Sequence, residues 1–186
     1  MPSKRKQRTF GQNVSTSAVI VGVLFLVKSV EVLFQIAFEQ YGIAPRTQSG
    51  LLGIVFSPLL HANIDHLLAN SLPLFVLLIL LLSNPQYRPW QTIALIWIAS
   101  GLGTWIIGRG DAIHIGASSI IFGLASFLIA SGFHLRNWRA ILVGILVFVL
   151  YGGIFYGIIP RADHVSWEGH LCGAIAGILA ARYIKN

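Results

Sequence analysis

The chain has 186 residues, of which 55% are hydrophobic and only 10% charged, and its formal net charge is +7. Soluble domains carry about 25% charged residues, so the composition excludes an ordinary water-soluble globular domain, and we expect lipid to surround most of the chain. The single cysteine, Cys172, excludes a disulfide framework within the chain. The basic residues lie in short segments between apolar runs, which favours membrane topology over nucleic-acid binding.

Six apolar runs are each about long enough to cross a bilayer core of about 30 Å. They cover residues 14–38, 61–82, 91–107, 117–133, 139–158 and 168–184. The first run is too long for the apolar region of a signal peptide, and it lacks a convincing cleavage site. The sequence therefore predicts an all-α, polytopic membrane protein with six transmembrane helices. We expect a basic N-terminal tail over residues 1–12 and one membrane domain over residues 13–186.

The lysine and arginine residues between the runs predict the orientation of the chain. With a cytoplasmic N-terminus, nine basic residues fall on the cytoplasmic side: Lys4, Arg5, Lys6, Arg8, Arg88, Arg136, Arg139, Arg182 and Lys185. Three fall outside: Arg46, Arg109 and Arg161. This positive-inside bias places both termini in the cytoplasm, in a multi-pass protein of the cell (inner) membrane.

Four polar side chains stand out in this apolar background. His66 and Asn70 are four residues apart and share one face of the second predicted helix. Ser118 lies at the start of the fourth predicted helix, and His170 lies at the start of the sixth. All three helices enter the membrane from the outside. We therefore expect these side chains at one depth, just below the outer surface, where three helices can bring them together.

A serine and a histidine at one depth predict nucleophilic catalysis. A serine hydroxyl is a weak nucleophile until a neighbouring base takes its proton, and histidine titrates in the useful range. We interpret Ser118 as the nucleophile and His170 as its base. Phe122 lies on the same helical face as Ser118 and is expected to pack against the His170 ring. No Asp or Glu is well placed for that orienting role, although Glu168 is close in sequence.

Hydrolysis of a peptide bond also needs donors for the developing oxyanion. The first backbone N–H groups of the helix that starts near Ser118 have no intrahelical partners. His66 and the amide of Asn70 can add donors. Gly116, just before the serine, leaves room for the backbone of a substrate.

Simpler structural explanations remain open for each motif. A Gly-Ala-Ser run in a membrane helix often forms a packing face, and His66 with Asn70 can form an interhelical hydrogen-bonding patch or a proton relay. Gly173 and Gly177 form a Gly-x-x-x-Gly motif, for which we favour close helix packing. Lys28 and Glu31 in the first predicted helix are interpreted as a structural ion pair that faces other helices or water.

The ordered set of motifs resembles the rhomboid family of intramembrane serine proteases over roughly residues 42–182. The matching residues are His61, His66 and Asn70, then Gly116-Ala117-Ser118, then His170 with Gly173 and Gly177. The resemblance implies a rhomboid-like bundle, with Ser118 as nucleophile and His170 as base. It also implies an oxyanion hole formed by His66, Asn70 and the Ser118 N–H, and an aromatic ring, Phe122, stacked on the catalytic histidine. Ser119 departs from the glycine that usually follows the nucleophile.

By this resemblance we expect a serine endopeptidase that cuts transmembrane protein substrates within the bilayer and uses no cofactor or metal. Two alternatives remain. One is a catalytically inactive rhomboid-like protein that binds membrane clients. The other is a small transporter or channel that uses His66, Asn70 and His170 as a polar pathway; the clustering of these residues near one face argues against it, because a pathway needs polar residues through the full thickness of the membrane.

Overall fold

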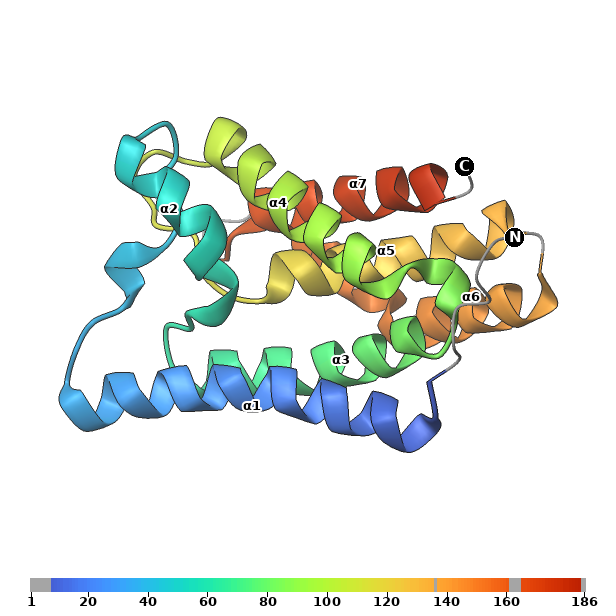
Figure 1. Ribbon diagram of the computed structural model, residues 1–186. Coiled ribbons are helices and arrows are strands. Elements are labelled where there is room, and N and C mark those ends of the chain that lie inside the picture. The colour runs from blue at the N-terminus through green and yellow to red at the C-terminus, as the bar shows by residue number, and fades with distance from the viewer. Residues whose placement is uncertain (1–7, 136, 161–164, 185–186) are drawn as a thin grey trace, which may run out of the picture.

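The computed structural model describes residues 8–135, 137–160 and 165–184, and this part of the chain is a bundle of helices without a β-strand (Figure 1). The longer helices are α1 (Phe10–Phe34), α3 (Ile64–Leu82), α4 (Pro89–Ile107), α5 (Ser118–His134), α6 (Trp138–Tyr151) and α7 (Trp167–Ile184). They correspond one to one to the six apolar runs of the sequence. The all-α prediction is therefore confirmed.

Four segments in the described part of the chain are long and apolar enough to cross a membrane. These are Phe10–Phe34, Ile64–Leu82, Pro85–Ile107 and Trp138–Ile158. The third segment consists of the 3₁₀ helix η3 (Pro85–Tyr87) followed by α4, and the fourth consists of α6 followed by the 3₁₀ helix η4 (Gly152–Ile158). The hydropathy and length of these segments support a membrane protein.

The predicted bounds of the first helix are wrong by four residues at each end. The helix starts at Phe10 because Thr9 and Gln12 form a capping box, in which each side chain accepts a hydrogen bond from the other residue's backbone N–H. It ends at Phe34 because Gln35 adopts the left-handed conformation, with φ 54°. Residues 35–38, although largely apolar, lie outside the helix.

A short helix, α2 (Gln48–Phe56), lies between the first two apolar runs, where the sequence predicted no helix. Thr47 caps it by accepting a hydrogen bond from the N–H of Gly50. Two 3₁₀ turns flank it, η1 (Glu39–Tyr41) and η2 (Ser57–Leu59). This compact connection leads from α1 to α3 and brings Ser57 next to the segment that precedes α5, where the N–H of Gly116 donates to the Ser57 carbonyl at 2.8 Å.

Helix α5 lies in the centre of the bundle and contacts α3, α4, α6 and α7. Its packing against α7 is very close because glycines on both helices leave no side chain between the backbones. A Cβ on Gly173 would collide with the carbonyl of Ser119, and a Cβ on Gly177 would collide with that of Gly123. The structural reading of the Gly-x-x-x-Gly motif is confirmed. The packing sets the start of α7 directly beside the start of α5.

Candidate active site

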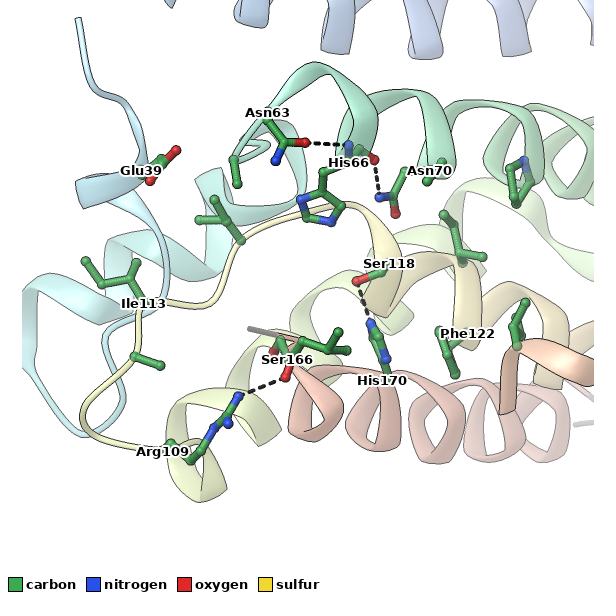
Figure 2. A pocket seen from close by; sticks show the side chains of 18 of the residues that line it. Glu39, Asn63, His66, Asn70, Arg109, Ile113, Ser118, Phe122, Ser166 and His170 are labelled. Atoms are coloured by element: carbon green, nitrogen blue, oxygen red, sulfur yellow. Dashed lines mark hydrogen bonds between the residues drawn. The ribbon is translucent and has the colours of Figure 1, made fainter. Parts of the chain in front are cut away.

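The hydroxyl of Ser118 and the imidazole of His170 lie within hydrogen-bonding distance, with 2.9 Å between Oγ and Nε2. Ser118 is the first residue of α5, and His170 lies in the first turn of α7. Figure 2 shows the two side chains pointing toward each other across the contact between these helices. The structure thus brings together two residues that are 52 positions apart in the sequence.

Two further groups fix the orientation of the His170 ring. Its Nδ1 lies 2.9 Å from the carbonyl oxygen of Gly157 in η4, and a carbonyl can only accept, so Nδ1 carries the proton. Nε2 is then free to accept the proton of Ser118. Phe122 stacks on the face of the His170 ring, with ring centroids 4.1 Å apart and an angle of 9° between the planes. The histidine is held in the tautomer that a general base needs.

His66 and Asn70 lie on α3, on the other side of Ser118 from His170 (Figure 2). Asn63 caps this helix and accepts a hydrogen bond from the N–H of His66 at 2.7 Å. The side-chain amide of Asn70 donates to the His66 carbonyl at 2.7 Å, one turn earlier. That bond uses one of the two amide hydrogens and leaves the other available.

Gly116 lies against the His66 ring, and this position requires glycine for two reasons. Its φ is +110°, a conformation that residues with a Cβ rarely adopt. A Cβ at this position would also lie 2.7 Å from Cε1 of His66. The next residue, Ala117, donates its N–H to Nε2 of His61 at 3.4 Å. The N–H of Ser118 follows, in the first turn of α5, where a helix offers no acceptor.

A cavity of about 920 Å³ opens onto these groups. Its lining includes His66, Asn70, Ser118, Phe122 and His170, together with charged residues farther along it: Glu39, Arg109 and Asp111. The volume is in the range of sites that hold small molecules, and polar groups line it. The cavity reaches the side chain of Ser118.

A second layer of polar contacts holds the start of α7. Glu168 is fully buried, and its Oε1 lies 2.9 Å from Nε of Arg109 in an ion pair whose geometry is not that of a hydrogen bond. Arg109 also donates to the carbonyl of Val165 at 2.8 Å. In the same loop, Nδ1 of His114 lies 2.6 Å from Oγ of Ser166. Burial lowers the pKa of His114, which favours its neutral form.

The chain matches the model of the Rhomboid domain over residues 48–186. The chain belongs to the rhomboid family. A Mycobacterium tuberculosis protein described as uncharacterised is 43% identical over 176 residues, 90% of this chain and 73% of the relative. The putative rhomboid protein of Acanthamoeba polyphaga mimivirus is 29% identical over 143 residues, 72% of this chain and 75% of the relative. RHOMBOID-like protein 2 of Arabidopsis thaliana is 32% identical over 126 residues, 63% of this chain and 37% of the relative. No solved structure matches the chain significantly.

Within this rhomboid chain, the structure separates the two adjacent serines. The hydroxyl of Ser118 meets His170, whereas the backbone of Ser119 lies against Gly173 of α7. Ser119 thus stands at one of the points where the backbones of α5 and α7 are in contact.

The sequence did not point to Gly157, whose carbonyl orients the rhomboid histidine. A backbone carbonyl leaves no signature in a residue pattern, and the segment that carries it was predicted as the end of a transmembrane helix. Glu168, noted for its closeness in sequence to His170, forms an ion pair with Arg109 instead. Among the described residues, no group of three or more His, Cys, Asp or Glu side chains is arranged to hold a metal ion.

Proposed function

We propose that this rhomboid protein is an intramembrane serine endopeptidase that hydrolyses peptide bonds in or near the transmembrane segments of other membrane proteins. The observation that carries the proposal is the pairing of Ser118 Oγ with His170 Nε2 at 2.9 Å, in a ring whose other nitrogen donates to the Gly157 carbonyl. A serine next to a histidine of fixed tautomer is the arrangement that nucleophilic acyl transfer requires.

The first half of the reaction forms an acyl-enzyme. As Ser118 Oγ attacks the scissile carbonyl carbon, its proton passes to Nε2 of His170, and the carbonyl oxygen becomes an oxyanion. The N–H of Ser118 and the side chains of His66 and Asn70 are the donors for this oxyanion. Collapse of the tetrahedral intermediate breaks the C–N bond, and His170 returns its proton to the leaving amine.

The second half hydrolyses the ester that links the substrate to Ser118. A water molecule from the cavity loses a proton to Nε2 of His170 and attacks the ester carbonyl. The same donors bind the second oxyanion, and the proton then goes to Ser118 Oγ as the new carboxylic acid leaves. The protein groups supply every proton transfer, so the cycle needs no cofactor.

The substrates that suit this site are transmembrane proteins in the same bilayer. A helix must open locally before its peptide bond is exposed to a nucleophile, because its backbone groups are satisfied internally in lipid. We place the chain in the inner (cell) membrane as a multi-pass protein with six crossings and both termini in the cytoplasm. The active site then lies near the outer face.

The test is cleavage of a single-pass transmembrane substrate by purified protein in liposomes. Ser118→Ala and His170→Ala should each reduce cleavage by at least about 10³-fold, because the two groups act as a unit. Ser119→Ala is the matched control and should cleave at nearly the wild-type rate. Cleavage at wild-type rates by either dyad variant would refute the mechanism. A folded wild-type protein that binds such substrates but never cuts them would instead favour a catalytically inactive rhomboid-like protein.

A further inference from the structure

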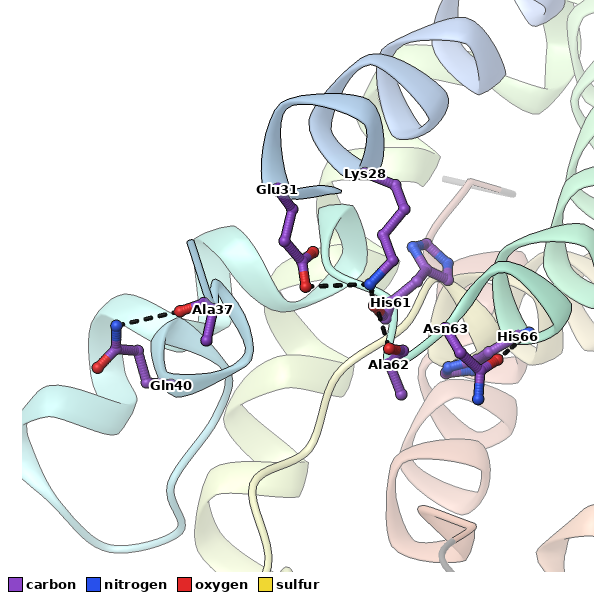
Figure 3. Close-up of polar contacts among 8 residues, drawn as sticks. All are labelled: Lys28, Glu31, Ala37, Gln40, His61, Ala62, Asn63 and His66. Carbon is purple, nitrogen blue, oxygen red and sulfur yellow. Dashed lines mark hydrogen bonds and ion pairs between the residues drawn. The ribbon is translucent and has the colours of Figure 1, made fainter. Parts of the chain in front are cut away.

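The catalytic proposal gives no role to the buried ammonium group of Lys28 on α1. Its Nζ lies 3.0 Å from Oε1 of Glu31, one turn along the same helix. The same Nζ donates to two backbone carbonyls of another segment, at 2.9 Å to His61 and 3.1 Å to Ala62. Figure 3 shows the lysine reaching out of α1 to this segment, which leads into α3.

The two carbonyls belong to residues outside regular helix, between η2 and α3. Carbonyls in such a position have no helical N–H to accept from, so they need partners elsewhere. Lys28 supplies one donor group for both. Glu31 offsets its charge, which limits the cost of burying the ammonium. The interaction thus fixes the path of the chain immediately before α3.

That path determines where several groups of the active site lie. The imidazole of His61 accepts the N–H of Ala117, the residue before the nucleophile. Asn63, the next residue but one, caps α3 through the N–H of His66. The rings of His61 and His66 meet edge to face, with centroids 5.2 Å apart. A shift of residues 61–63 would therefore move both His66 and the backbone at Ala117, which leads to Ser118.

We propose that Lys28 is a positioning residue for the active site: by holding the carbonyls of His61 and Ala62, it keeps His66 and the Ala117–Ser118 backbone aligned as oxyanion donors. This inference rests on the proposed serine chemistry. It assigns α1 a part in catalysis, although α1 itself contributes no residue to the cavity lining. Misplacement of catalytic groups by about 1 Å can cost about 100-fold in rate.

The test compares the rate at which a fluorophosphonate probe labels folded protein in several variants. The double variant Lys28→Met/Glu31→Gln removes the ammonium without leaving an unpaired carboxylate. It should label about 10- to 100-fold more slowly than Glu31→Gln alone, which keeps the lysine and both carbonyl contacts. Lys28→Arg should recover most of the rate because its guanidinium can donate to both carbonyls. Substrate cleavage by the double variant should show a lower kcat with a smaller change in KM.

Ser17→Ala is the matched control on the same helix. Ser17 is fully buried and lies about 16 Å along α1 from Lys28, at 1.5 Å per residue, so its labelling rate should equal that of the wild type. If Lys28 only stabilises the fold, its substitution should lower the thermal unfolding midpoint and leave the labelling rate of the folded fraction unchanged. That result would overturn the inference.

If the double variant does not fold, Lys28→Gln and Lys28→Arg decide the question. The glutamine keeps a shorter, neutral donor and should label more slowly than the arginine at equal folded fraction, and equal rates would overturn the inference. Absence of labelling in the wild-type protein would overturn the serine chemistry and this inference together. Wild-type labelling with an unaffected double variant would overturn this inference alone.

Discussion

At the residue scale, the His170 ring is held by two groups of different kinds, a backbone carbonyl and an aromatic face. The carbonyl of Gly157 selects the tautomer, while Phe122 limits how the ring can tilt. A triad protease gives both tasks to a carboxylate. Here Glu168, the carboxylate close to His170 in sequence, forms an ion pair with Arg109. The group that bonds to His170 Nδ1 is instead a neutral backbone carbonyl.

The stacking contact makes a prediction about Phe122. Phe122→Leu should lower kcat by about 3- to 10-fold with little change in KM, because an aromatic pair contributes about 0.5–1.5 kcal/mol beyond its buried area. The measurement is steady-state cleavage of a transmembrane substrate. Phe127→Leu is the control, since Phe127 is buried on the same helix but packs against Tyr87. Equal kcat losses in the two variants would mean that Phe122 acts only through packing.

Sequence reasoning at this scale identified the side chains and the Ser118 N–H, and it missed the backbone carbonyl that orients His170. The structure brings five of the residues predicted from the pattern to one cavity: His66, Asn70, Ser118, Phe122 and His170. Gly116, also predicted, lies against the His66 ring. Their reactive types and positions at helix starts made this possible. The Gly157 carbonyl was out of reach because its placement depends on how α6 changes into a 3₁₀ helix, which no residue type specifies.

At the scale of elements, the dyad depends on how closely α5 and α7 pack. The serine and histidine belong to different helices, so their separation follows the distance between the helix axes. Gly123, Gly173 and Gly177 allow backbone-to-backbone contact, and Ser126 adds a hydrogen bond from its Oγ to the Ala174 carbonyl at 2.8 Å. Small residues at such interfaces are the main source of close packing between membrane helices.

A methyl group placed in the interface between α5 and α7 should move Ser118 and His170 apart, although it lies far from both. Gly177→Ala would put its Cβ against the Gly123 carbonyl, and overpacking of this kind costs about 1–3 kcal/mol. We expect a lower unfolding midpoint and slower probe labelling, although the glycine lies two turns beyond His170. Ile175→Ala, on the exposed side of the same helix, should leave both quantities nearly unchanged. Wild-type labelling by folded Gly177→Ala would show that the dyad does not depend on this contact.

The elements that sequence predicted well are those with a strong apolar signal. Six runs became six helices because length and hydropathy decide which segments can cross a bilayer. The α2 helix was missed because its nine residues are too short for that signal and include two glycines. The end of α1 was missed because Gln35, without a glycine or proline nearby, adopts the left-handed cap.

At the scale of the whole molecule, arginine side chains lie at two ends of the bundle, as Arg8, Arg46, Arg88 and Arg109 show. Arg8 and Arg88 line one cavity of about 320 Å³. Arg46, by contrast, donates to the carbonyl of Gly108 at 2.8 Å, beside Arg109 and on the side where the active-site cavity opens. Six of the basic residues on which the orientation was predicted lie outside the described residues: Lys4, Arg5, Lys6, Arg136, Arg161 and Lys185. The end with Arg8 and Arg88 is the one that we assign to the cytoplasm.

Reporter fusions in a bacterium test this orientation. Alkaline phosphatase is active only outside the cytoplasm, so a fusion after Ile184 should be inactive and an insertion after Asp111, in the loop between α4 and α5, should be active. Green fluorescent protein at the C-terminus should fluoresce. The reverse pattern of phosphatase activity would place the active site on the cytoplasmic side and contradict the assigned topology.

The central claim is that Ser118 is a nucleophile activated by His170. The most direct measurement is parallel labelling of purified wild-type protein, Ser118→Ala and Ser119→Ala with a fluorophosphonate probe, followed by mass spectrometry of the modified peptide. We predict a single adduct on Ser118 in the wild type and in Ser119→Ala, and none in Ser118→Ala. An adduct on Ser119, or no adduct in folded wild-type protein beside a labelled control protease, would contradict the account.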